Sequence, residues 1–416
     1  MVHRFNILLI ALLATCVNYS AAAQDWPQFR GPTGQGMSTA KGLPIEWGET
    51  KNIAWKAEIP GQGWSSPVLS ENKLYLTSAV SSGGPVSLHA LCLDAKEGTI
   101  LWDKEVLRPD PVAVKAMHKK NSPASATPIV TKDKLYVHFG HLGTAALDLS
   151  GKILWTQTTL KYSPVHGNGG SPMLLGDQLI FSCDGGAAPF LVALDAATGT
   201  VKWKTPRNTP AKRTFSFCTP LVIDVDGVTQ VISPGSGFVG GYEPATGHEL
   251  WRVRYAEGYS VVPRPVFAHG LLFISSGFDS AVLYAIKPEG AKGDATEMNV
   301  AWKNRQGAPK TPSMLVVGDE LYYVSDEGMA TCADARTGET HWTHHFNGGF
   351  SSSPIFAEGR IYFQNEGGVG FVVKAEKTFS LLSENDLGER SLASYAATDG
   401  ALFIRTDKHL CKISGN

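Results

Sequence analysis

A short unit recurs six times along this chain, and it limits the fold more than any other feature of the sequence. In every copy an apolar segment leads into a turn that contains Asp, or a substitute for it, and Gly, and a second segment then ends on Trp. The copies span residues 91–102, 146–155, 193–203, 241–251, 287–302 and 333–342, of which the second is shorter and the fifth longer. Such internal repetition is typical of folds that stack one supersecondary unit many times.

The residues of the unit have local physical roles. An Asp side chain bonds to backbone amides two residues further on and fixes the turn, and Gly accepts the positive φ that lets the chain reverse. A Trp on the outer strand can bury a large ring against the neighbouring unit. Seven of the ten tryptophans occupy this position, and we predict that they dock one unit onto the next: Trp55, Trp102, Trp155, Trp203, Trp251, Trp302 and Trp342.

A second pattern, a hydroxyl residue followed by Pro and an apolar strand, marks the start of each unit. The hydroxyl residues are Ser66, Thr127, Ser171, Thr219, Thr311, Ser353 and Ser394, and only the last lacks the Pro. The fifth unit has Arg264-Pro265 at this place, which brings the markers to eight. A hairpin of short, alternating segments follows each marker, a pattern that predicts strands and not helices.

The last unit is incomplete, because the stretch from Ser394 to Asn416 has room for only three strands. A matching outer strand, with Trp55, lies at the other end of the sequence. An N-terminal strand that completes the last unit would close a ring without free edges. We therefore predict an all-β fold for residues 53–416, an eight-bladed β-propeller of four-stranded antiparallel blades, preceded by an extended segment at residues 24–52.

Residues 1–23 have the features of a secretory signal. His3 and Arg4 precede a short apolar run, and three alanines provide a cleavage site before Gln24. The run is too short to span a membrane, and no later segment qualifies. We therefore predict export to the periplasm or beyond the cell and no transmembrane segment.

Cys16 and the residues before it loosely resemble a lipoprotein cleavage box, but Thr15 fits that box poorly. We therefore favour soluble export over a lipid anchor. Lys and Arg number 37 against 38 Asp and Glu, so no global excess of positive charge points to nucleic acid as a partner.

The Ala-x-Asp-x-x-Thr-Gly-x-x-x-Trp unit, complete at residues 193–203, resembles the repeat of pyrroloquinoline quinone (PQQ) propellers, also called the tryptophan-docking repeat. The resemblance covers about residues 53–416. It implies three branches of function: quinoprotein dehydrogenases, which hold PQQ and a metal on the propeller axis; assembly factors such as BamB, which bind other proteins without a cofactor; and exported propellers that open with a segment like residues 25–36. This chain is most similar to the third branch.

Three departures separate this chain from the dehydrogenase branch. Its members are usually larger, many stack PQQ against a disulfide of adjacent cysteines, and their metal-binding carboxylate and amide have no matching positions here. We therefore predict an exported, non-catalytic scaffold that binds a protein or envelope ligand through one face, without a cofactor. The alternative is a small quinoprotein oxidoreductase that uses PQQ and Ca²⁺ to oxidise alcohols or sugars.

In the predicted topology, the chain before each innermost strand shares one face, the funnel, with the loops between second and third strands. Cations and aromatic residues dominate the residues expected there: Trp64, His118, Lys119, Lys120, His138, His141, His166, Asn168, Lys212, Arg213, Phe215, Phe217, Arg264, Lys310 and Arg390. Nine are candidate binding residues for an anionic or carbonyl-bearing partner: Trp64, His166, Asn168, Lys212, Arg213, Phe217, Arg264, Lys310 and Arg390. The competing interpretation is an ordinary solvated loop surface.

Arg264 is central to this hypothesis because it replaces the hydroxyl residue of the other units. A buried Arg is costly unless it meets a carboxylate or a ligand, so the alternatives are a ligand contact and a structural pair with Asp. His138 and His141 lie three residues apart on a predicted turn, but without a third ligand they do not predict a metal site.

Five cysteines remain after signal cleavage, so at least one thiol is unpaired. Cys183 ends a second strand and Cys218 begins the next innermost strand, which places both near the same face of neighbouring blades. An exported compartment permits oxidation, and we predict this pair as the candidate disulfide.

Overall fold

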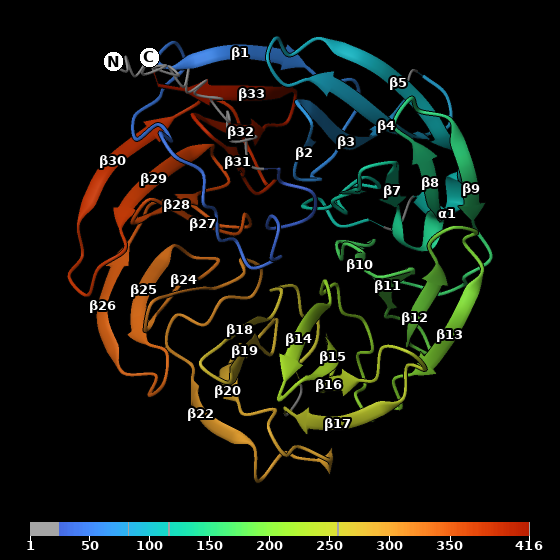
Figure 1. Ribbon diagram of the computed structural model, residues 1–416, viewed down its shortest axis with the longest axis vertical. Coiled ribbons are helices and arrows are strands. Elements are labelled where there is room, and N and C mark those ends of the chain that lie inside the picture. Colours follow the sequence, from blue (N-terminus) through green and yellow to red (C-terminus); the bar gives the residue numbers. More distant parts are fainter. Residues whose placement is uncertain (1–24, 82, 115–116, 256–257, 416) are drawn as a thin grey trace, which may run out of the picture.

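Antiparallel hairpins of short strands follow one another along the chain, and in the computed structural model they form eight sheets set as blades around a central axis (Figure 1). The structure describes residues 25–81, 83–114, 117–255 and 258–415. The predicted all-β, eight-bladed propeller is confirmed. In each blade the innermost strand comes first in the chain and the outermost strand last, except in the blade that the N-terminus completes.

The first four blades take up the chain as far as residue 254. Their strands are β2 (Val68–Ser70), β3 (Lys73–Val80), β4 (Ser87–Asp94) and β5 (Ile100–Leu107); β6 (Ile129–Val130), β7 (Lys134–His138), β8 (Thr144–Asp148) and β9 (Ile153–Gln157); β10 (Met173–Leu175), β11 (Gln178–Cys183), β12 (Phe190–Asp195) and β13 (Val201–Pro206); and β14 (Leu221–Val225), β15 (Val228–Gly235), β16 (Phe238–Tyr242) and β17 (Glu249–Arg254).

The remaining four blades follow in the same order. Their strands are β18 (Val266–Ala268), β19 (Leu271–Ser275), β20 (Leu283–Ile286) and β22 (Val300–Asn304); β23 (Leu315–Val317), β24 (Glu320–Val324), β25 (Met329–Asp334) and β26 (Thr340–His345); β27 (Ile355–Ala357), β28 (Arg360–Gln364), β29 (Val369–Lys374) and β30 (Leu381–Asp386); and β31 (Ala396–Thr398), β32 (Ala401–Arg405) and β33 (His409–Ser414) with β1 (Ile53–Glu58).

The N-terminal strand closes the ring. β1 pairs antiparallel with β33, with Trp55 opposite Lys412 and Glu58 opposite His409. Figure 1 shows the two strands, from opposite ends of the chain, side by side at the rim of the ring. The last three strands therefore receive the outer strand that the sequence predicted, and β1 covers the edge that β33 would otherwise expose.

The fourth blade differs from the others. A short strand, β21 (Gly293–Asp294), pairs parallel with β17 and makes this sheet five-stranded. It comes from the long turn of the fifth repeat, which the sequence showed as an insertion. The four predicted antiparallel strands are thus present in this blade as in the others, and the inserted turn of the next blade adds a fifth strand to it.

Six of the seven repeat tryptophans reach the next blade. Their indole Nε1–H groups donate to carbonyl oxygens in the turn of the following blade, over 2.9–3.3 Å: Trp55 to Ala95, Trp102 to Leu149, Trp155 to Ala196, Trp203 to Pro244, Trp302 to Ala335 and Trp342 to Glu376. The ring lies against the turn glycine. A Cβ on Gly199, whose φ is +74°, would come within 2.5 Å of the Trp155 ring, so only Gly fits there.

Trp251 behaves differently. It is 1% exposed, and its Nε1–H donates to Gln230 Oε1 of its own blade over 2.7 Å. The following blade has the long insertion instead of a short turn, and β21 pairs alongside Trp251 at Gly293. The expected docking turn is therefore absent at this position, and the tryptophan packs within the fourth blade.

Residues 25–47 close one end of the central channel. Trp26 pairs with Leu69 of the first blade, and the chain then crosses the axis (Figure 1). Met37 bridges to Phe356 of the seventh blade. In the turn of the eighth blade, Lys41 N–H donates to Asp399 Oδ1, and Lys41 O accepts from Gly400 N–H. We call this stretch the N-terminal plug.

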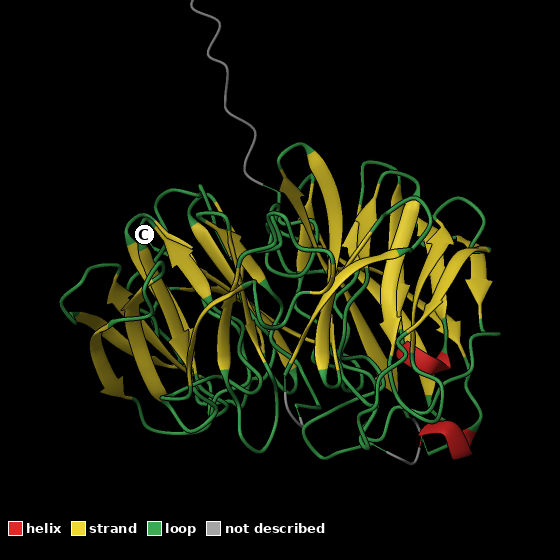
Figure 2. Ribbon diagram, turned by 90° about the horizontal axis from the view of Figure 1, so that it is seen from below, coloured by secondary structure: helices red, strands yellow, loops and turns green. Residues whose placement is uncertain are grey.

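The opposite end carries the two short helices of the described chain, α1 (Pro111–Val114) and the 3₁₀ turn at Gly140–Leu142, both at the lower edge of the ring in Figure 2. This is the face where the chain before each innermost strand and the loops between second and third strands lie. Within the described ranges, no helix has the length and apolar character to cross a membrane.

Candidate functional site

A cavity of about 800 Å³ opens on the funnel face, on the propeller axis. Its floor includes Phe29 of the N-terminal plug, and its wall is formed by segments from the blades around it. Four of the nine candidate residues line this cavity: Trp64, His166, Arg213 and Phe217.

Aromatic rings cover the part of the wall that comes from the third to fifth blades. The Phe215 ring centroid lies 5.3 Å from that of His166, 6.0 Å from that of Phe217 and 5.5 Å from that of Tyr259, and Tyr259 lies 6.2 Å from Phe278. We call these five side chains the aromatic arc. Phe278 is 51% exposed, so the arc runs from the buried wall out to solvent.

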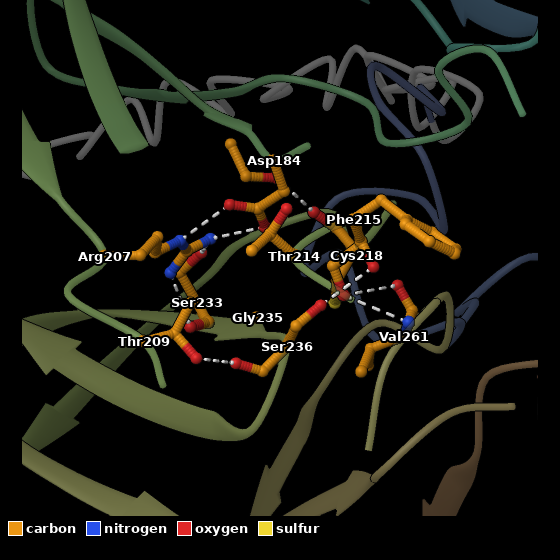
Figure 3. A network of polar contacts seen from close by, with 12 residues as sticks. Asp184, Arg207, Thr209, Thr214, Phe215, Cys218, Ser233, Gly235, Ser236 and Val261 are labelled. Atoms are coloured by element: carbon orange, nitrogen blue, oxygen red, sulfur yellow. Dashed lines mark hydrogen bonds and ion pairs between the residues drawn. The ribbon is translucent and has the colours of Figure 1, made fainter. Parts of the chain in front are cut away.

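Backbone bonds and a buried polar network hold the arc in place. Ser260 N–H and Ser236 Oγ–H both donate to the carbonyl of Phe215, and Phe217 N–H donates to Val261 O. Beneath lies the pair of Asp184 and Arg207 (Figure 3). Both side chains are 1% exposed and joined by two bonds of 2.9 and 3.0 Å, and Arg207 Nη2 also reaches Ser233 Oγ. The bidentate pair lies within the third blade and fixes the Arg207 guanidinium, which joins the fourth blade through its bonds to Ser233.

Seven hydroxyl residues form a ring around the lower wall of the cavity. We call it the hydroxyl ring: Ser66, Thr127, Ser171, Thr219, Ser313, Ser353 and Ser394. The backbone N–H of one member donates to the side-chain oxygen of the next, over 2.8–3.2 Å, and Ser394 returns to Ser66. In the sixth blade the ring member is Ser313 and not Thr311, so that predicted marker was two residues out of register.

Arg264 interrupts the ring between Thr219 and Ser313. It is 2% exposed, and its side chain turns away from the cavity: Nε donates to Pro220 O over 3.1 Å and Nη1 to Phe29 O over 2.7 Å. The prediction that Arg264 is an accessible binding residue is wrong. The alternative, a structural pair with Asp, does not hold among the described residues either, because the partners of Arg264 are carbonyl oxygens of the fourth blade and the plug.

Four of the cations around the funnel have carboxylate partners. Lys120 pairs with Glu366 at 2.7 Å, Arg213 with Asp279 at 3.2 Å, Lys310 with Glu327 at 2.6 Å and Arg390 with Asp407 at 3.7 Å. The sequence suggested an excess of free positive charge on this face. That expectation fails for these four cations, because loops of the same or of another blade bring acidic residues beside them; Lys212 is exposed.

The other candidate residues lie outside the cavity wall. Asn168 is buried and donates from Nδ2 to Gly170 O over 2.8 Å, so it shapes the loop instead of meeting a ligand. Lys212 is exposed beside the cavity. Lys310 and Arg390 lie at the rim, where the Arg390 guanidinium is 5.2 Å from the Trp64 ring.

The histidines of the predicted turn are structural. His138 is 1% exposed and its Nδ1 lies 2.8 Å from Thr144 Oγ1. Burial, with a smaller effect of the nearby His141, lowers the pKa of His138 to about 3, so the ring is neutral at physiological pH. Across the described ranges, no group of three or more His, Cys, Asp or Glu side chains is placed to hold a metal ion.

The carboxylates near the cavity are already engaged. Asp326 lines the wall and accepts bonds from Lys310 N–H, Thr311 N–H and Thr311 Oγ1–H. Burial raises the pKa of Asp326, and these bonds oppose that effect. Glu366 Oε1 accepts hydrogen bonds from Lys120 Nζ and Ser351 Oγ. These groups stabilise loops and do not form an open ligand set for Ca²⁺.

The predicted disulfide is absent: Cys183 and Cys218 are buried, free thiols, as are Cys92, Cys332 and Cys411. Cys218 Sγ bonds to Pro263 O over 3.1 Å, on the side of the fifth blade. The two thiols therefore take part in separate packing regions, which the position along the strands could not reveal.

Comparison with known proteins shows to which family this repeat belongs. A family model described as outer membrane protein assembly factor BamB matches residues 37–164, 150–327 and 292–409. The chain belongs to this family. No curated protein matches it significantly.

Solved structures show the same architecture at low identity. BamB from Moraxella catarrhalis is 13% identical, covers 88% of this chain and 97% of its own, and has a TM-score of 0.62. The computationally designed Ika8 protein is 11% identical, with 88% and 100% covered and a TM-score of 0.61. A europium-containing methanol dehydrogenase is 12% identical, with 84% and 89% covered and a TM-score of 0.48. At these identities the likeness concerns the fold alone.

Three aromatic residues of the cavity were not among the predicted ones: Phe29, Tyr259 and Phe278. Tyr259 precedes an innermost strand and Phe278 lies between a second and a third strand, so the same positional rule would have selected both. Phe29 lies outside the repeat, and its place on the axis follows only from the path of the plug.

Proposed function

We propose that this chain is an exported, non-catalytic scaffold that holds part of a protein or envelope ligand in its funnel. The observation that carries the proposal is the cavity of about 800 Å³ with the aromatic arc on its wall. Pockets of this size with aromatic walls and a few polar groups are typical ligand sites. The family model's description as an assembly factor agrees with a protein partner.

The direction from which a ligand approaches follows from the difference between the two ends of the channel, one filled and one open. The N-terminal plug fills one end, so a ligand enters from the funnel. Phe278, at the outer end of the arc, offers an exposed aromatic surface, and aromatic side chains contribute much of the binding free energy at such sites. Export, from the features of residues 1–23, would place this opening in the periplasm or outside the cell.

Photo-crosslinking in the native cells tests the proposal. A photoreactive amino acid in place of Phe278 should capture a ligand. The matched control is the same substitution at Val228, which is 55% exposed but lies on the turn of the first hairpin of its blade, at the plug end. Equal capture at both positions, or none at Phe278, would refute the proposal.

The quinoprotein alternative finds no support in the residues of the funnel. The carboxylates of its wall are bound to Lys120, Arg213, Lys310 and backbone amides, and the chain has no adjacent cysteines. Incubation with PQQ and Ca²⁺ should therefore give neither a bound quinone spectrum nor dye reduction with alcohols or sugars. Tight binding with turnover would reverse this conclusion.

A further inference from the structure

We propose that the floor of the funnel binds a single carboxylate group, carried on an apolar or aromatic body that rests on the aromatic arc. This inference rests on the proposed function and specifies the chemistry of its ligand. It depends on two observations: the hydrogen-bond balance of the hydroxyl ring, and two buried arginines behind the floor.

The hydroxyl ring presents donors to the cavity. A hydroxyl group has one proton and two acceptor lone pairs. All seven oxygens of the ring accept a backbone N–H, six from a neighbouring ring member and Ser313 from Arg264. Only Ser353 gives its proton to a protein atom, Ser313 Oγ, at 3.0 Å. In the described chain the other six protons have no acceptor.

These six hydroxyls line the cavity, so their protons are available to a ligand there. The group that satisfies them must be rich in acceptors and need not donate. A carboxylate has two oxygens with about four lone-pair sites and no proton at neutral pH. Hydrogen bonds to an ionised acceptor are about twice as strong as neutral ones.

Positive charge lies directly behind the floor. Phe29 lines the cavity, and its carbonyl accepts the bond from Arg264 Nη1. The next residue, Arg30, is 1% exposed; its Nη2 donates to Gln35 O and Met314 O. Arg30 Nε and Nη1 are buried without a partner among the described residues.

Within the described ranges, the side-chain partners of both arginines are carbonyl oxygens, and neither has a carboxylate partner. Burial, together with repulsion from Arg264, lowers the pKa of Arg30 to about 9, and burial lowers that of Arg264 to about 10. Both groups thus remain charged at pH 7. Buried charges that lack a counter-charge are costly, and an anion in the funnel would offset part of that cost through space.

The wall limits the charge of the ligand. The nearby cations Lys120, Arg213, Lys310 and Arg390 are each occupied by a carboxylate. They are therefore not available for a second negative charge, so a monoanion fits better than a phosphate dianion. The aromatic arc then receives the apolar part of the same molecule.

The test compares two probes of nearly the same shape, one with a carboxylate and one with a neutral amide in its place. Calorimetric titration of the mature protein at pH 7 should show N-acetyl-L-phenylalanine binding about tenfold more tightly than N-acetyl-L-phenylalaninamide. Acetate should compete with the acid better than inorganic phosphate does. Equal affinity of acid and amide, or stronger competition by phosphate, would overturn the carboxylate assignment.

Variants of the ring provide the second measurement. Thr127→Val with Thr219→Val removes two donors at nearly constant shape, and should bring acid and amide to similar affinities. The matched control, Thr127→Ser with Thr219→Ser, keeps the hydroxyls and should keep the preference for the acid. Retention of the preference in the valine variant would also refute the assignment.

The outcomes separate this inference from the proposed function. If the amide binds as well as the acid, and Phe215→Ala weakens both, the funnel remains a binding site and only the carboxylate is refuted. If neither probe binds at millimolar concentration while the Phe278 position still captures a partner, the carboxylate assignment is likewise refuted and the funnel remains a binding site. If the Phe278 position captures nothing, the proposed function itself is refuted.

Discussion

The two ends of the central channel are formed by the same eight blades, but the arginines and lysines at the two ends have different kinds of partner. At the plug end, Arg30 and Arg264 are buried and bonded to backbone carbonyls. At the funnel end, cations such as Arg213 and Lys120 are exposed or half-exposed and paired with carboxylates. Four cations of the funnel are thus paired with carboxylates, whereas the partners of Arg30 and Arg264 behind the floor are backbone carbonyls.

This difference shows why a count of basic residues near a site is a weak guide. Exposed ion pairs contribute little to stability because water screens them, whereas buried guanidinium groups demand a full set of partners. We therefore expect the plug to contribute to stability although it lies outside the repeat. The ion pairs of the funnel rim should contribute less than the number of charged residues there suggests.

Removal of the plug together with the closing strand should have the largest effect. A chain that begins at Ile59 loses β1 and exposes the edge of β33, so we expect loss of the cooperative thermal transition or a Tm lower by at least about 10 °C. A chain that begins at Asn52 keeps β1 and should melt between this variant and the mature protein. Equal Tm values for all three chains would show that neither element stabilises the ring.

Aromatic side chains at the two ends provide a matched comparison. Trp26 is 0% exposed under the first blade, and Trp26→Ala should cost about 3–5 kcal/mol in the free energy of unfolding. Phe278→Ala, in the funnel, should cost less than about 1 kcal/mol. Urea unfolding of both variants measures the difference, and similar losses would contradict the contrast between a packed and an open end.

Glu389 is a partly buried carboxylate next to β1, and its substitution tests how much such a charge contributes to stability. It accepts bonds from His409 Nδ1 and Lys408 N–H, and lies 3.1 Å from Lys56 Nζ of β1. Burial alone would raise the pKa of Glu389, but the bonds from His409, Thr406 and Lys408 outweigh it and lower the pKa to about 2.

Because the folded-state pKa is below the unfolded value of about 4.3, this stabilisation is present above that value and is lost as the pH falls toward 2. Glu389→Gln should therefore cost roughly 1–3 kcal/mol at pH 7 and flatten the acid limb of the stability profile. An acid limb of unchanged steepness would show that other carboxylates control the acid unfolding.

The smallest effect is expected for an exposed ion pair of the funnel. Arg213 is 57% exposed and pairs with Asp279 at 3.2 Å, so Arg213→Ala should change the unfolding free energy by less than about 0.5 kcal/mol. Arg207→Ala is the contrasting variant, because it leaves Asp184 buried without its partner and should cost about 3–5 kcal/mol. Comparable losses would mean that burial does not distinguish the two pairs.

The repeat pattern was sufficient to predict the ring. The repeated turn, the tryptophans and the incomplete last unit predicted eight blades and their closure by residues 53–58, because each of these features acts through local geometry and strand order. It also located the funnel and four of its lining residues, Trp64, His166, Arg213 and Phe217, since position within a blade decides the face on which a loop lies.

The path of the plug, the direction of the Arg264 side chain and the pairing of the funnel cations could not be predicted from the repeat and follow from the folded chain. Each depends on atoms that meet across blades, such as Phe29 O beneath Arg264 or Glu366 beside Lys120. The same holds for Trp251, whose neighbour lacks the docking turn, and for the thiols of Cys183 and Cys218. A repeat pattern specifies what one blade does, but contacts between distant segments depend on the closed ring.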